Sequence, residues 1–66
     1  MAKTFEIITR VGISYESISD AVKTVVEDTN SKNQVSWFEV VEQRGRVTQD
    51  GQIEYQVTVK LGIKSE

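Results

Sequence analysis

Trp37 and Gln56 are the two side chains whose types best suit the recognition of a ligand. Trp37 is the only tryptophan among 66 residues, and an indole ring can stack on a planar ligand, which is worth about 1–3 kcal/mol per contact. Gln56 offers both a donor and an acceptor to the edge of a ring with carbonyl and N–H groups. Other interpretations stay open: Trp37 can pack against another subunit, and Gln56 can bond across a sheet or to water.

Three basic side chains, Arg44, Arg46 and Lys64, are candidates for holding a phosphate. Arginine would bind it through a bidentate fork and lysine as a point charge. Taken alone, each of these residues is more often a solvated charge on a strand. In a regular strand Arg44 has the same parity as Phe38, so its access to the face of Trp37 depends on a bulge or on a neighbouring subunit.

The residue types give poor support for catalysis or metal binding. The chain has no histidine and no cysteine, and no serine lies in a nucleophile-elbow motif beside a plausible base. Glu39 and Glu42 are an odd number of residues apart, so a regular strand would not place them on one face. The glycines stand alone rather than in a phosphate-binding loop, and no loop has the ligand spacing of a hard-cation site. We therefore predict no catalytic residue, no metal ligand and no enzyme activity.

The bulk properties indicate one small domain, residues 1–66, that associates with itself. Chains of this size bury only about 60% of their unfolded surface. Without cysteine or histidine, disulfides and common zinc sites are excluded, so oligomerisation is the remaining way to stabilise the core. A net charge of −2 argues against nucleic acid as a partner. The chain has no apolar run of about 20 residues and no signal peptide, so we expect no membrane association and a cytoplasmic location.

The first half of the chain predicts a strand followed by a helix. Residues 4–11 alternate with a period of two that is typical of a strand, and Gly12 is expected to end it. Ser14 is the predicted N-cap, with Glu16 in the first helical turn. Polar residues 30–33 end the helix. Apolar residues at helical spacing form one stripe: Ile18, Ala21, Val22, Val25 and Thr29.

The second half predicts a hairpin of two strands, residues 34–47 and 53–64. Asp50-Gly51 is typical of a two-residue type I′ turn. That turn would place Phe38 opposite Ile63 and Val40 opposite Leu61, so that apolar positions coincide.

The same register places Trp37 opposite Lys64 and Gln56 opposite Gly45. The helix is expected to cover the face with Phe38, which makes Phe38 a core residue and leaves Trp37 and Gln56 on a face that this chain does not cover. The predicted fold class is α+β: a β-α-β-β chain with a three-stranded antiparallel sheet and one amphipathic helix on one face.

Several short motifs in this order resemble the dodecin family. They are Trp37-Phe38-Glu39-Val40, Arg44-Gly45, Glu54-Tyr55-Gln56-Val57 and Leu61-Gly62-Ile63, with Val11-Gly12-Ile13-Ser14 at the start of the helix. The resemblance extends over almost the whole chain. It implies a hollow spherical homododecamer that binds flavins in stacked pairs between tryptophans of symmetry-related subunits.

The resemblance also implies roles for individual residues. Trp37 matches the stacking tryptophan, Gln56 the glutamine that bonds the flavin ring edge, and Arg44 an arginine near the ligand in bacterial members. Lys64 stands where the family commonly has arginine, which keeps the charge but not the fork. Ile13 and Ile63 stand where the family commonly has threonine and phenylalanine.

The function implied by the resemblance is storage and buffering of a flavin (FMN, riboflavin or FAD) and quenching of its photochemistry, without turnover. Coenzyme A is a further ligand implied by some bacterial members. Two other functions stay open. One is a structural oligomeric module without a cofactor, in which Trp37 packs between subunits. The other is an enzyme that uses bound flavin, although the open face lacks an evident proton donor.

Overall fold

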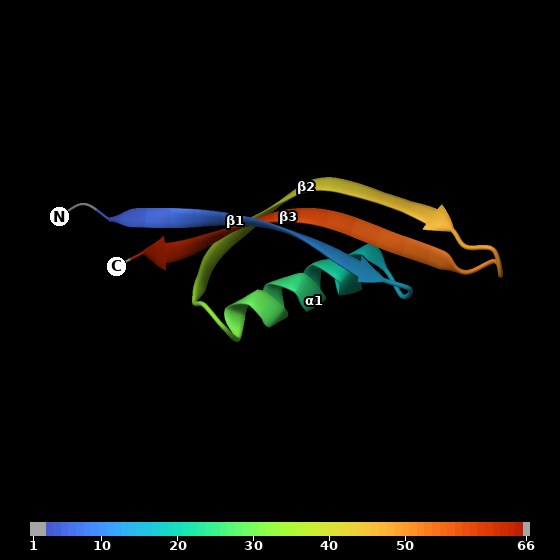
Figure 1. Ribbon diagram of the computed structural model, residues 1–66, viewed down its shortest axis with the longest axis horizontal. Coiled ribbons are helices and arrows are strands. Elements are labelled where there is room, and N and C mark those ends of the chain that lie inside the picture. Colours follow the sequence, from blue (N-terminus) through green and yellow to red (C-terminus); the bar gives the residue numbers. More distant parts are fainter. Residues whose placement is uncertain (1–2, 66) are drawn as a thin grey trace.

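The chain forms three strands and one helix in the predicted order. The computed structural model describes residues 3–65, which form β1 (Thr4–Ser14), α1 (Ile18–Asn30), β2 (Val35–Val47) and β3 (Ile53–Ser65). All strand pairs are antiparallel, and β3 lies between β1 and β2. Figure 1 shows α1 on one side of the sheet and the other side uncovered. The predicted α+β class is confirmed. No helix within residues 3–65 is long and apolar enough to cross a membrane.

The core lies between α1 and the central strand. Val57, Val59 and Leu61 of β3 are fully buried, and they pack with Ala21 and Val25 of the helix. The predicted helical stripe is confirmed. Three of its members are buried, and Ile18 and Val22 pack against the core from its edge.

The helix begins one turn later than the sequence predicts. Its N-cap is Ser17, whose Oγ accepts a hydrogen bond from the N–H of Asp20 at 2.9 Å. Ser14 still belongs to β1, where its Oγ accepts from Glu16 N–H at 2.8 Å and donates to Asp20 Oδ2 at 2.7 Å. The prediction of Ser14 as the N-cap and of Glu16 in the first turn was therefore wrong. The acidic residue near the positive end of the helix dipole is Asp20.

Gly12 lies inside β1 and does not end it. It pairs with Val57 of β3, and a Cβ at this position would lie 2.5 Å from the carbonyl oxygen of Ala21. The glycine therefore permits close approach of the helix to the sheet. Pairing with β3 keeps the strand regular as far as Ser14, which is why the helix start is displaced.

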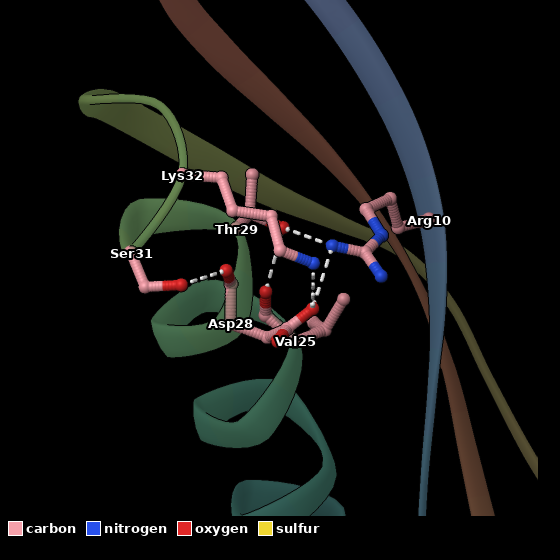
Figure 2. Close-up of polar contacts among 6 residues, drawn as sticks. All are labelled: Arg10, Val25, Asp28, Thr29, Ser31 and Lys32. Atoms are coloured by element: carbon pink, nitrogen blue, oxygen red, sulfur yellow. Dashed lines mark hydrogen bonds and ion pairs between the residues drawn. The ribbon is translucent and has the colours of Figure 1, made fainter.

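Side chains of β1 and the helix hold the C-terminal end of α1 against the sheet (Figure 2). Arg10 Nη1 donates to Asp28 Oδ2 at 3.0 Å and to Thr29 Oγ1 at 2.9 Å, and Lys32 Nζ lies 3.8 Å from the same carboxylate oxygen. The buried Thr29 hydroxyl in turn donates to the Val25 carbonyl at 2.8 Å. The predicted helix end near residue 30 is confirmed.

Phe38 is not a core residue, although it lies on the predicted side of the sheet. It pairs with the fully buried Leu61, yet 48% of it is exposed. The helix lies mainly over β1 and β3, so this part of β2 extends beyond its cover. Phe38 instead borders an open groove together with Val22 and Val26 of the helix. The prediction was right about the face and wrong about burial.

The hairpin turn contains three residues rather than two. Thr48 N–H donates to the carbonyl of Gln52 at 2.8 Å, which leaves residues 49–51 in the loop. The Thr48 hydroxyl also donates to Asp50 Oδ1 at 2.5 Å, and Gly51 alone adopts a positive φ of 86°. This is the arrangement of a three-residue loop with a left-handed glycine. The wider loop changes the register by one residue at the base of the hairpin.

Two register shifts in β2 change the pairing further. They lie between Val40 and Glu42 and between Val35 and Trp37. As a result Phe38 pairs with Leu61 rather than Ile63, so the predicted register was wrong. The partners of Phe38 and Trp37 on β3 each differ from the predicted partners by two residues. Because this difference is even, both side chains keep their predicted faces, whereas an odd difference would move them to the opposite face.

Candidate functional site

The face of the sheet that α1 leaves uncovered carries the candidate residues. Four of the five side chains of β1 on this face are apolar and about half exposed: Phe5 45%, Ile7 55%, Val11 53% and Ile13 49%. The fifth is Thr9. The side of β1 toward the helix carries Ile8, Arg10, Gly12 and Ser14. The more apolar half of the first strand is thus directed away from the core of its own subunit.

Trp37 lies over Gly62 of β3. The two residues are Cα partners, and a Cβ added to Gly62 would overlap indole atoms Cε2, Nε1 and Cζ2. Gly62 is buried, while Trp37 is 38% exposed. The glycine therefore lets the ring lie close to the sheet, and part of the ring stays accessible. On the other side of Gly62 its partner in β1 is Ile7.

Lys64 lies near Trp37 but is not its partner. The predicted pairing of Lys64 with Trp37 was wrong, because Gly62 occupies that position and Lys64 pairs with Phe5 of β1. Lys64 shares the face of Gly62 and lies two residues further along β3, about 7 Å away. It is exposed. We call the group Ile7, Trp37, Gly62 and Lys64 the aromatic end of the open face.

Arg44 is the Cα partner of Gln56 and shares the open face with it. The sequence predicted Gly45 as that partner, which was wrong, because Gly45 pairs with Tyr55. The register shift after Val40 supplies the bulge that Arg44 needed to change face. Arg44 is largely exposed, and its Nη1 lies 3.8 Å from Glu42 Oε2.

A second arginine, Arg46, lies next to Arg44 on the same face and is paired with Glu54 of β3. Arg46 Nε donates to Glu54 Oε1 at 2.7 Å, and the hydroxyl of Tyr15 donates to Glu54 Oε2 at 3.2 Å. The hydrogen bond from Arg46 is the main cause that lowers the pKa of the Glu54 carboxyl below its ordinary value, and the bond from Tyr15 acts in the same direction. We call Arg44, Arg46, Glu54 and Gln56 the polar end of the open face.

The comparison with known proteins identifies the family of this chain. Residues 4–66 match the family model described as Dodecin. This chain belongs to the Dodecin family. It is 31% identical to the dodecin of Thermus thermophilus over 67 residues, with 100% of this chain and 97% of the relative covered.

Solved structures of dodecins have the same fold. The dodecin from Streptomyces davaonensis superposes with a TM-score of 0.89 at 28% identity, covering 100% of this chain and 98% of the other. The dodecin from Streptomyces coelicolor gives a TM-score of 0.87 at 29% identity, covering 97% and 93%. A tryptophan-to-phenylalanine mutant of the Thermus thermophilus dodecin gives 0.87 at 29% identity, covering 98% of each chain.

The four predicted site residues fall into two groups in this dodecin subunit. Trp37 and Lys64 lie at the aromatic end, and Gln56 and Arg44 lie at the polar end. Gln56 and Gly62 are six positions apart, which corresponds to about 20 Å along β3. The prediction placed Trp37 and Gln56 on one open face, which the register confirms, but a ring stacked on Trp37 ends well before Gln56 of the same subunit.

Gly62 and the pair Glu54–Tyr15 were not predicted as parts of a site. A glycine inside a strand indicates a close approach of some group, and the alternation already placed Gly62 on the face of Trp37. The contact between Gly62 and Trp37 could therefore have been predicted from the sequence. The contact of Tyr15 with Glu54 had no signal, because it depends on β1 extending to Ser14. Within residues 3–65, no three His, Cys, Asp or Glu side chains gather into a possible metal site.

Proposed function

We propose that this protein binds a flavin by stacking it on Trp37 and sequesters it without turnover. The observation that carries the proposal is the position of Trp37, which lies over Gly62 on an uncovered face and is 38% exposed. Membership of the Dodecin family supports flavin binding in general. The electron-rich indole can return an excited flavin to its ground state by rapid electron transfer, which would quench its photochemistry. Neither role needs an acid, a base or a metal.

We propose that the protein acts as a homo-oligomer in the form of a hollow dodecamer. The subunit exposes 4810 Å², whereas a compact monomer of 7.5 kDa exposes about 4,250 Å². Apolar side chains are exposed on both faces of the sheet, including Ile7 and Ile13 on one side and Phe38 on the other. Surfaces of this kind mark contacts with other chains. A second copy of this chain is the partner that the family resemblance favours.

The flavin site would then combine two subunits. The β3 partner of Trp37, Gly62, is about 20 Å along the strand from Gln56. A flavin ring that contacts both a tryptophan and a glutamine would therefore take Trp37 from one copy of the chain and Gln56 from another. Lys64 and Arg44 would bring positive charge toward the phosphate of FMN, which makes FMN the preferred ligand over riboflavin, with FAD as a related one. Coenzyme A remains a prediction of the family resemblance, and its phosphates would be held by the same charges.

The proposal is tested by the absorption spectrum and native mass of the purified protein, followed by titration with FMN. We expect a mass of twelve subunits and quenching of Trp37 and flavin fluorescence together. A saturating flavin should also raise stability by about 2.7 kcal/mol at one hundred times its dissociation constant. A colourless oligomer whose Tm does not change with flavin would favour a structural module in which Trp37 packs between subunits.

A further inference from the structure

Arg46 is fixed at one edge of its guanidinium group and exposed at the other. Its Nε donates to Glu54 Oε1 at 2.7 Å, and the Arg46 side chain is 67% exposed while that of Glu54 is only 13% exposed. The second carboxylate oxygen of Glu54 accepts from Tyr15. No other described residue bonds Nη1 or Nη2 of Arg46. The carboxylate thus orients the guanidinium and leaves its outer donors available.

Arg44 and Arg46 occupy alternate positions of β2 on the same face. Their Cα atoms are about 7 Å apart, which is the spacing of two residues along a strand. Both side chains border a recess of about 120 Å³ that is also lined by Gly45, Glu54 and Gln56. Arg44 and Arg46 therefore border the same small polar space. Guanidinium groups bind phosphate oxygens through paired hydrogen bonds.

We propose that Arg46, together with Arg44, holds the phosphate monoester of the bound ligand and so determines its specificity. The inference rests on the proposed flavin binding and adds a residue to it. Glu54 and Tyr15 are positioning residues, because Glu54 accepts hydrogen bonds from Arg46 and from Tyr15, and its carboxylate has no donor to offer a phosphate.

The charged residues around the recess leave a net positive charge that attracts a phosphate. Glu54 offsets one of the two arginines, and the Arg44–Glu42 contact of 3.8 Å is too loose to engage the Arg44 guanidinium fully. Salt bridges at the protein surface contribute little to stability, so stability alone gives little reason for the Arg46–Glu54 pair. A guanidinium oriented in advance loses less rotamer freedom when it binds.

The test compares FMN with riboflavin, which share the ring system and differ by the phosphate. Each is titrated by fluorescence quenching into the assembled wild type and the variants Arg46→Gln, Arg46→Lys and Lys23→Gln. We expect Arg46→Gln to weaken FMN binding about tenfold, which corresponds to about 1.4 kcal/mol, and riboflavin binding less than about twofold. Arg46→Lys should lie between. Lys23→Gln removes a positive charge from the helix side and should change neither affinity.

Equal weakening of both ligands by Arg46→Gln, or no weakening of FMN, would overturn the role of Arg46 and leave stacking on Trp37 intact. Failure of wild type to bind either ligand would instead overturn the proposed function. Native mass establishes that the variants assemble. If Arg46→Gln does not assemble, the inference is tested by competition with inorganic phosphate in the wild type. Inorganic phosphate should weaken FMN binding and leave riboflavin binding unchanged. Equal effects on both ligands would contradict the inference.

Discussion

The aromatic end and the polar end of the open face are built in different ways. At the aromatic end the decisive feature is a missing side chain, since Gly62 lets the Trp37 indole lie close to the sheet. At the polar end the decisive feature is an added residue, since the bulge after Val40 moves Arg44 to the face of Gln56. The aromatic end thus depends on local packing, and the polar end depends on strand register. The two ends should therefore fail under different changes.

The largest effect is expected from Gly62→Ala. The new Cβ would overlap the indole of Trp37, so the ring must leave its place over the sheet. We expect a loss of about 1–3 kcal/mol in stability, as for other overpacked sites, together with a changed Trp37 emission spectrum and loss of flavin binding. Thermal unfolding and FMN titration measure these effects. Lys60→Ala, on the same strand and face, is the control and should keep the wild-type spectrum.

Insertion of one alanine between Glu42 and Gln43 tests the polar end. With the bulge after Val40 kept, the added residue displaces Arg44 by one position and therefore moves it to the helix side of the sheet, away from the face of Gln56. We expect FMN binding to weaken at least about tenfold, or about 1.4 kcal/mol. Gln43→Ala keeps the residue count and is the matched control. Unchanged FMN affinity in the insertion variant would show that the strand register has no role in the site.

Gln56→Ala should have a smaller effect. It removes one hydrogen bond to the ring edge, which is worth about 1 kcal/mol, and it leaves the stacking surface in place. Binding of FMN and riboflavin should weaken by similar factors, in contrast to Arg46→Gln. A loss as large as that caused by removing Trp37 would contradict this division of roles.

The smallest effect concerns acid pH. The pKa of Glu54 is lowered from an ordinary value of 4.5, so its carboxylate stabilises the fold above that pH, and this contribution is lost as pH falls through the lowered pKa. In Glu54→Gln the stability should therefore fall less steeply with acidification than in wild type. Urea unfolding at a series of pH values measures the slope. Identical slopes would contradict the Arg46–Glu54 hydrogen bond. Asp50, whose pKa is also lowered, is present in both proteins and cancels in the comparison.

The sequence predicted the elements better than the connections between them. The helical stripe and the opposite faces of Trp37 and Phe38 followed from periodicity alone. The length of the turn did not follow from the sequence, because Asp50-Gly51 suits both two-residue and three-residue loops. In the three-residue loop that forms, the Thr48 hydroxyl donates a hydrogen bond to Asp50. The register shifts had no signal, since Val41 is an ordinary strand residue. The position of Trp37 and Gln56 on one open face was predicted, and the separation of the candidate residues into two ends was not.

The exposure of Phe38 has a different origin. Its apolar type and its pairing with Leu61 both favour burial, and the single subunit does not supply the cover. A prediction based on one chain assigns every large apolar residue to the core of that chain. In a small subunit that associates with copies of itself, part of the apolar surface is reserved for the neighbours.

Stacking on Trp37 is tested most directly by FMN titration of wild type and Trp37→Ala, both verified as assembled by native mass. Stacking is worth about 1–3 kcal/mol per contact, so we expect Trp37→Ala to bind FMN about five- to 150-fold more weakly and no longer to quench its fluorescence. Arg10→Lys, which alters the helix side, should bind as wild type does. If Trp37→Ala bound FMN as tightly as wild type and quenched it equally, stacking on Trp37 would not be the basis of the site.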